Sequence, residues 1–167
     1  MSAYLITGEA GTGKSTLAIE LHKRGYIAYD GDRTPGLTYH ADRSTGRPIT
    51  EMLDQYAETD WVWDRNRLRE LLNNPRDVFI TGATSNQQNF YPVFRKIFML
   101  TIDAETLTYR LQNRSAGDYG MHPEELKEIL RTFEGFQRRT IEEDGAIPID
   151  ATQPLTKVAD DIIAYLP

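Results

Sequence analysis

The sequence contains no cysteine, and this absence excludes disulfide bonds and thiolate metal sites. We therefore expect any bound metal ion to have oxygen ligands. No apolar run approaches the ~20 residues that a membrane-spanning helix requires. The first residues also lack the basic and apolar segments of a secretory signal. Together these absences lead us to expect a cytoplasmic protein.

An excess of positive charge is missing as well. The chain of 167 residues has 19 lysine and arginine residues against 25 acidic ones, which gives a formal net charge of −6. A domain that binds nucleic acid in general carries a basic face for phosphates, so we do not expect nucleic acid as a partner. The length suits one domain with one hydrophobic core, which we expect to work as a monomer or homodimer without a membrane partner.

The strongest motif lies near the start of the chain. It fits the pattern G-x-x-x-x-G-K-[ST] through Gly8, Gly13, Lys14 and Ser15. This pattern indicates a phosphate-binding loop when a strand runs into it and a helix leaves it. Residues 4–6 form a short apolar run typical of a buried strand, and apolar residues recur at helical spacing from Thr16 onward. The alternative, a glycine-rich turn with an exposed lysine, does not account for these flanks.

A loop of this kind lies at a helix amino terminus, where unpaired N–H groups and the helix dipole favour a bound phosphate. Lys14 would contact the terminal phosphates of a nucleotide. Ser15 would place its hydroxyl on a magnesium ion that bridges the outer phosphate oxygens. The loop residues that we expect to bind the nucleotide are Gly8, Ala10, Gly11, Thr12, Gly13, Lys14, Ser15 and Thr16.

Two acidic residues follow the second expected strand, at residues 26–29. Ligands of open α/β sheets bind beyond the carboxyl ends of the strands, so Asp30 and Asp32 should stand beside the phosphate loop. A carboxylate there either holds a magnesium-bound water or accepts a proton from an attacking hydroxyl. The third expected strand ends in Thr81, without the usual acidic residue, which makes Asp30 or Asp32 the nearest replacement. An acidic turn without a catalytic role is the alternative.

Residues 33–60 interrupt the alternation of strands and helices. We expect either an insertion that contacts the acceptor substrate or an irregular surface excursion, with a small hairpin around the turn at Gly46. Trp61 and Trp63 are expected to open a helix that stops at residues 73–75. The two rings either stack on a substrate or, as is more common, pack in the core.

The remaining strands are expected at residues 78–81, 96–102 and 146–149, with helices between and after them. The helix at residues 104–114 carries Arg110 and Arg114 one turn apart. These arginines either serve as a platform for a base and a charge for phosphate or form a solvated basic edge. Five strands alternating with helices predict a doubly wound parallel sheet of the α/β class.

Four segments in this order resemble the small-kinase branch of the P-loop proteins, which contains nucleoside monophosphate kinases, shikimate kinase and gluconate kinase. They are residues 8–16, 30–32, 109–114 and 149–154. The resemblance implies a three-layer P-loop NTPase fold with sheet order 2-3-1-4-5, helices on both faces and a short lid at residues 115–121 over ATP. Arg110 would stack on the adenine and Arg114 would contact its phosphates. The adenine edge would be lined by Ala151, Thr152 and Gln153.

By the same resemblance, Asp30 and Asp32 look like an acidic pair with one member near magnesium and one near the acceptor hydroxyl. The expected catalytic residues are Lys14, Asp30, Asp32 and Arg114, and the expected magnesium ligands are Ser15 and Asp32. The segment after the third strand, residues 81–86, lacks the Asp-Gly-Phe-Pro-Arg type sequence with which monophosphate kinases hold their acceptor.

We therefore expect a magnesium-dependent kinase that transfers the γ-phosphate of ATP to a hydroxyl or phosphate of a small molecule other than a standard nucleoside monophosphate. The acceptor would be a nucleoside, a less usual nucleotide or another metabolite. A nucleotide-binding switch or regulatory ATPase without a small-molecule acceptor is the alternative.

Overall fold

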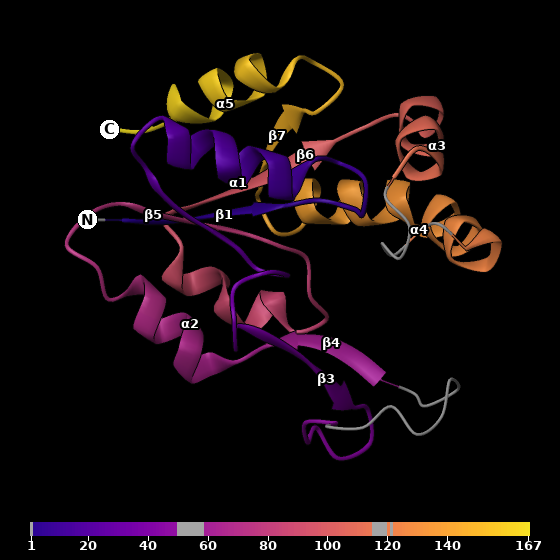
Figure 1. Ribbon diagram of the computed structural model, residues 1–167, viewed down its shortest axis with the longest axis horizontal. Helices are drawn as coiled ribbons and strands as arrows, with labels where there is room; N and C mark the ends of the chain where they lie inside the picture. The colour runs from indigo at the N-terminus through magenta and orange to yellow at the C-terminus, as the bar shows by residue number, and fades with distance from the viewer. Residues whose placement is uncertain (1, 50–58, 115–119, 121) are drawn as a thin grey trace.

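Five parallel strands form the centre of the structure, a computed structural model that describes residues 2–49, 59–114, 120 and 122–167 (Figure 1). The strands are β1 (Ala3–Thr7), β2 (Ile27–Asp30), β5 (Val78–Thr81), β6 (Lys96–Thr101) and β7 (Ile147–Asp150). They lie in the order β2-β5-β1-β6-β7, which confirms the expected order 2-3-1-4-5. The central strand β1 is buried on both faces, because successive apolar side chains point to opposite sides of the sheet.

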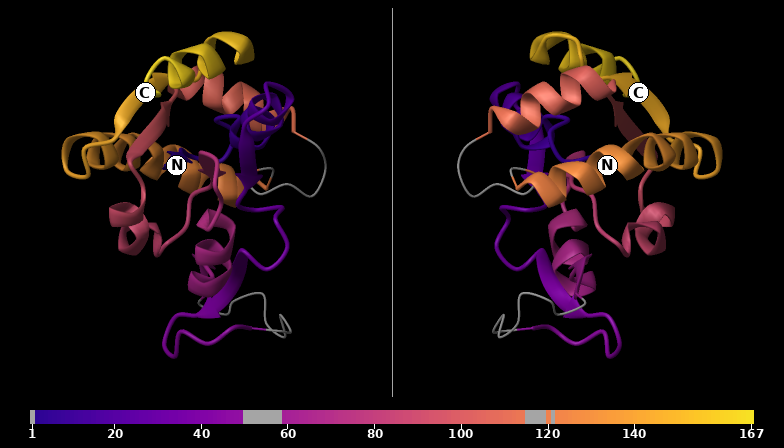
Figure 2. Two further views of the ribbon diagram at one scale, coloured as in Figure 1. Left: turned by 90° about the vertical axis from the view of Figure 1, so that its left-hand side faces the viewer. Right: turned by 90° about the vertical axis from the view of Figure 1, so that its right-hand side faces the viewer.

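Helices cover both faces of this sheet (Figures 1 and 2). They are α1 (Lys14–Lys23), α2 (Arg65–Leu72), the 3₁₀ helix η1 (Gln87–Val93), α3 (Ala104–Gln112), α4 (Pro123–Glu142) and α5 (Leu155–Ile163). One face, with Tyr4 and Ile6, packs against α1 and α5. The opposite face, with Leu5 and Ile80, packs against α2 and η1. A further cluster joins Ile102 to α3 and α4, so the expected three-layer arrangement is present.

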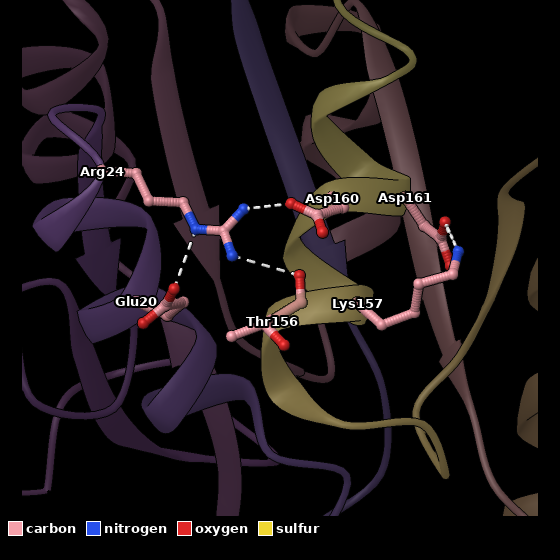
Figure 3. Close-up of polar contacts among 6 residues, drawn as sticks. All are labelled: Glu20, Arg24, Thr156, Lys157, Asp160 and Asp161. Atoms are coloured by element: carbon pink, nitrogen blue, oxygen red, sulfur yellow. Dashed lines mark hydrogen bonds and ion pairs between the residues drawn. The ribbon is translucent and has the colours of Figure 1, made fainter.

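Polar contacts tie α1, the helix that follows the phosphate loop, to α5 (Figure 3). Arg24 donates from Nε to Glu20 Oε1 at 2.8 Å within the α1 region, and from Nη2 to the carbonyl oxygen of Thr156 at 3.1 Å. Its Nη1 also pairs with Asp160 of α5. The hydrogen bond to Glu20, which has the largest effect, and the one to Asp160 raise the pKa of Arg24 above its ordinary value. The contacts fix the carboxyl end of α1 against its neighbour.

The second sheet corrects the prediction for the two tryptophans. Trp61 and Trp63 lie in strand β4 (Thr59–Trp63), which pairs antiparallel with β3 (Thr38–Asp42), and they do not open a helix. The helix α2 begins after Asp64, whose side chain caps its first turn. Aromatic side chains suit strands, and Trp61 lies directly opposite His40 on β3. This cross-strand pairing, which joins residues far apart in the sequence, decided the conformation.

The expected hairpin with a glycine turn is present in a short form. After β3 the chain turns around Asp42, which accepts hydrogen bonds from Ser44 and Thr45. These bonds, with that from the Ser44 hydroxyl the largest, lower the pKa of Asp42 to about 2. Within residues 43–49, the described part of the returning chain, one bridge forms, between Pro48 and Ala41, and β3 pairs along its length with β4.

The other predicted elements are present with small shifts at their ends. The helix expected over residues 104–114 ends at Gln112, and the strand expected over residues 146–149 is β7. The expected lid, residues 115–121, lies outside the described residues except for Gly120, and so do residues 50–58 of the insertion. No helix in the described part of the chain is long and apolar enough to cross a membrane.

Gly31 offers a test of how closely the ends of β2 and β5 approach each other. A Cβ atom on Gly31 would lie 2.5 Å from the carbonyl oxygen of Thr81. We expect Gly31→Ala to lower the free energy of unfolding by about 1–3 kcal/mol, because the backbone must shift. The control Gly135→Ala in α4 meets nothing within 4 Å and should raise this free energy by up to about 1 kcal/mol. Urea denaturation measures both changes, and equal stability of the two variants would contradict the close approach.

Candidate active site

The phosphate loop connects β1 to α1, as the sequence predicts. It runs from Gly8, directly after β1, to Gly13, the N-cap residue of α1. Gly13 has a φ of 96°, in the left-handed region that favours glycine. Among the described residues no side chain caps the start of α1, so backbone N–H groups remain available there. The loop therefore has the backbone geometry of a phosphate-binding site.

Lys14, the first residue of α1, reaches back across this loop. Its Nζ donates to the carbonyl oxygens of Gly8 at 2.7 Å and Glu9 at 2.9 Å. Burial lowers the pKa of Lys14 below its ordinary value, and the negative charge of Asp32 is the largest influence in the opposite direction. The ammonium group is thus held by neutral carbonyl groups, which phosphate oxygens would replace with stronger, charge-assisted hydrogen bonds.

Asp30 and Asp32 lie beside Lys14, as expected for residues at the carboxyl end of β2. The charges of both carboxylates raise the pKa of Lys14, whereas the charge of Arg114 lowers it. The charges of the three other catalytic candidates therefore act on Lys14. The catalytic roles of all four residues stay predictions.

Asp30 also organises its own turn. Its Oδ1 accepts the backbone N–H of Asp32 at 3.0 Å, and its carbonyl oxygen accepts the N–H of Thr34 at 2.8 Å. Its Oδ2 lies 3.8 Å from Nε of Arg33. Asp30 therefore stabilises the turn after β2, whereas its catalytic role stays a prediction. Asp32 is the exposed member of the pair and is better placed to contact a ligand.

Sequence reasoning missed the partner of Asp32. The indole Nε1 of Trp61 donates a hydrogen bond to Asp32 Oδ1 at 2.9 Å. The ring of Trp61 lies 4.7 Å from that of His40, centre to centre, so the second sheet presents an aromatic pair next to the acidic turn. The alternating Trp-Val-Trp sequence was the signal for a strand, but the residue that Trp61 contacts is 29 positions away.

Two buried polar groups at the same strand ends lack hydrogen-bond partners within the described residues. They are the Thr81 hydroxyl and the Trp63 indole N–H. Thr81 holds the position where an acidic residue is usual in this kind of fold. Alternation along β5 places Thr81 on the same face as Phe79, the face that α1 covers. Its hydroxyl is therefore a further candidate to contact a ligand beside the phosphate loop.

The donor set fits a magnesium ion that is held mainly by phosphates. Magnesium in nucleotide sites takes one or two protein oxygens and completes its shell with water and phosphate oxygens. Ser15 at the start of α1 and Asp32 at the end of β2 provide such oxygens. Within residues 2–49, 59–114, 120 and 122–167, no group of three or more His, Asp or Glu side chains could hold a metal ion alone.

The residues expected around adenine also come together. Arg110 Nη2 donates to the carbonyl oxygen of Ala151 at 2.8 Å, which fixes the guanidinium against the loop after β7. In this loop Asp150 accepts hydrogen bonds from Thr152 and Gln153, and these bonds, the Thr152 hydroxyl first, lower the pKa of Asp150. This hydrogen-bonded loop and the half-buried Arg110 beside it could form an edge for a flat base, whose binding stays a prediction.

Known proteins share the family and the fold of this chain. A family model described as an AAA domain matches residues 5–131. A comparison with curated proteins found no match.

Several solved structures have the same fold. A shikimate kinase from Acinetobacter baumannii is 20% identical with a TM-score of 0.64, over 98% of this chain and 91% of that one. A gluconokinase from Sinorhizobium meliloti is 18% identical with a TM-score of 0.58, over 98% and 90%. A deoxyadenosine kinase from M. mycoides is 16% identical with a TM-score of 0.58, over 97% of both chains. At these identities the likeness confirms the expected P-loop fold.

The hydrogen bond between Trp61 and Asp32 can be tested in solution. We expect Asp32→Ala to shift the indole N–H signal of Trp61 in a ¹⁵N–¹H NMR spectrum, because Nε1 loses its acceptor. Trp63, the second of the two tryptophans, serves as the internal control. Trp61→Phe assigns the signals and should lower the free energy of unfolding by about 1 kcal/mol. An unchanged Trp61 signal in Asp32→Ala would show that this hydrogen bond does not form.

Proposed function

Since the chain belongs to the AAA domain family, we propose that it uses its phosphate loop to bind ATP and transfers the γ-phosphate to a small-molecule acceptor. The acceptor group is a hydroxyl or a phosphate. This proposal agrees with the kinases that share the fold, named for gluconate, shikimate and deoxyadenosine. None of these names establishes the acceptor of this chain.

The observation that carries the proposal is the convergence of opposite charges on the phosphate loop. The Lys14 ammonium is bonded to carbonyl oxygens of the loop. The charges of Asp32 and Asp30 raise its pKa, and the charge of Arg114 lowers it. A loop that only binds a nucleotide needs the lysine and the backbone N–H groups. An acidic pair at the neighbouring strand end adds a group that can orient an acceptor, which is a requirement of transfer.

The proposed reaction is a displacement at the γ-phosphorus. An acceptor oxygen attacks this phosphorus, and the bond from phosphorus to the bridging oxygen of ADP breaks. A hydroxyl acceptor gives its proton to the acidic pair of Asp30 and Asp32. Lys14 and Arg114 stabilise the negative charge on the phosphoryl group during its transfer. Charge stabilisation of this kind is the main form of catalysis in phosphoryl transfer. Magnesium, held by Ser15 and Asp32, would neutralise the outer phosphate oxygens.

The second sheet is the proposed acceptor side of the site. Trp61 and His40 from β4 and β3 form an aromatic pair whose tryptophan is bonded to Asp32. An acceptor held against this pair would lie next to the acidic turn. The described residues therefore support an acceptor with a ring, such as a nucleoside or a cyclic polyol, for which aromatic faces provide a flat contact.

One observation favours the second candidate function, a regulatory ATPase or switch. The strand β5 ends in Thr81 and is followed by Gly82, with no acidic residue at the usual magnesium position. A switch would use ATP binding to change conformation and would hydrolyse it slowly. The two functions differ in one measurable property, which is the dependence of ADP formation on an acceptor.

Lys14→Met tests the donor site. The pKa of Lys14 is lowered in the folded state, so its charged form opposes folding at neutral pH, and this penalty fades as the pH rises above the lowered pKa. The unliganded variant should therefore melt at a slightly higher temperature than the parent. Saturating ATP and magnesium should raise the melting temperature of the parent by roughly 5–10 °C and that of Lys14→Met by little.

Lys23→Met, at the exposed end of α1, is the matched control and should respond to ATP as the parent does. If ATP raised the melting temperature of Lys14→Met as much as that of the parent, the loop would not be the ATP-binding site.

A screen for acceptors tests the transfer itself. The purified protein is incubated with ATP and magnesium and with gluconate, shikimate, deoxyadenosine and a set of other nucleosides and cyclic polyols. We expect one class to yield a phosphorylated product, detected by mass spectrometry, and to raise the rate of ADP formation at least about 100-fold. Lys14→Met should abolish the product. Slow ADP formation that no acceptor changes would instead establish the ATPase.

A further inference from the structure

A pocket formed by the described residues lies away from the phosphate loop. It is a groove of 930 Å³ between α2 and η1, two elements that lie next to each other in Figure 1. Its far end is closed by Ser2, Ala3 and Arg95, at the amino ends of β1 and β6. The phosphate loop follows the opposite end of β1, and no lining residue of the groove belongs to the candidate active site. The size is that of a pocket for a small organic ligand.

The rim of the groove is positively charged. Its cationic lining residues are Arg65, Arg69 and Arg95. Arg65 and Arg69 stand one turn apart on α2, both exposed, and neither pairs with a carboxylate among the described residues. The acidic lining residue Glu70 is already paired with Arg67 at 2.8 Å. A concentration of unpaired positive charge is notable in a chain whose net charge is −6.

The floor of the groove is apolar. It includes Leu68, Phe90 and Phe94, which are all buried in the core cluster beneath α2 and η1. The guanidinium of Arg65 lies 5.4 Å from the centre of the Phe90 ring, so a cation already stands over an aromatic face. A ligand in the groove would contact aromatic side chains below and guanidinium groups above.

We propose that this groove is a second binding site, for a small organic anion with a ring or another flat apolar group. The ring covers the Phe90 and Phe94 floor, and the anionic group, a phosphate or carboxylate, pairs with the arginines of α2 and with Arg95. Guanidinium groups bind phosphates and carboxylates through two parallel hydrogen bonds. The site should therefore bind anions more tightly than neutral ligands. This site rests on the geometry of the groove and not on the proposed kinase activity.

A second copy of the chain fits this surface poorly. In a twofold symmetric dimer both chains use the same patch, which would bring the arginines of both chains into one interface. Like charges at such an interface are unfavourable. The concave shape and the charge therefore both favour a small anion over self-association.

The ring of Trp63 provides a direct readout of binding. It packs against the floor of the groove, 5.8 Å from the ring centre of Phe90 and 6.2 Å from that of Phe94. Trp61 lies on the acceptor side, bonded to Asp32. A ligand in the groove should therefore shift the indole signal of Trp63 together with backbone signals of α2 and η1, whereas a ligand in the candidate active site should shift the signals of Trp61 and the loop.

The probe is 1-naphthyl phosphate, which has a ring and a phosphate, titrated into ¹⁵N-labelled protein and followed by ¹⁵N–¹H NMR. We expect saturable shifts of the Trp63 indole and of backbone signals from α2 and η1. Inorganic phosphate and 1-naphthol, which each carry half of the proposed chemistry, should bind at least about tenfold more weakly. Shifts confined to residues 8–16, or equal binding of either half alone, would overturn the proposal.

The double variant Arg65→Ala/Arg69→Ala should weaken 1-naphthyl phosphate binding at least about tenfold, because both charge-assisted contacts on α2 are lost. The matched control is Lys127→Ala/Arg131→Ala, which removes two exposed cations at the same spacing on α4. It should leave the affinity within about twofold of the parent, as expected for surface changes distant from a site. Unchanged binding in the α2 variant, or equal weakening in both, would contradict the assignment. These affinities are measured without ATP turnover, so they test the groove independently of the proposed kinase activity.

Discussion

The hydrogen bond from Gly31 N–H to the carbonyl oxygen of Thr81, at 2.6 Å, is the constraint on which the candidate site depends. It joins the turn after β2 to the end of β5, at a distance that only a residue without a Cβ atom permits. This hydrogen bond fixes the direction in which the chain leaves the sheet after β2. Asp30 and Asp32, on either side of this glycine, are thereby placed beside Lys14, where their charges offset the cost of its burial.

The second sheet extends this arrangement toward the proposed acceptor. Trp61 and Trp63 are two residues apart on β4, so they share one face of the strand. Trp63 packs beside the contact of Gly31 with Thr81, and Trp61 reaches the exposed carboxylate of Asp32. One short strand therefore supports the backbone of the acidic turn and holds its functional side chain. The cross-strand contact with His40 adds an aromatic surface next to that carboxylate.

Charge is distributed unevenly over the molecule, and this gives two regions that suit anions. At the phosphate loop, backbone N–H groups and the charges of Lys14 and Arg114 would attract an anion, and the charges of Asp30 and Asp32 act on the same lysine. In the groove between α2 and η1, Arg65 stands over the ring of Phe90, and the one acidic lining residue is already paired with Arg67. The first combination suits the transfer of a phosphate, which needs both signs of charge. The second suits binding alone.

The sequence by itself determined the local parts of this protein. The motif from Gly8 to Ser15 fixed the strand, loop and helix, because glycines and a helix start act within a few residues, and the apolar runs of the other strands fixed the parallel sheet. Only the tertiary structure decided the conformation of Trp61 to Trp63, the bond of Trp61 to Asp32 and the groove beneath Arg65 and Arg69. Each of these depends on pairing or packing between segments far apart in the chain, and a short apolar run suits a helix or a strand until its partner is known.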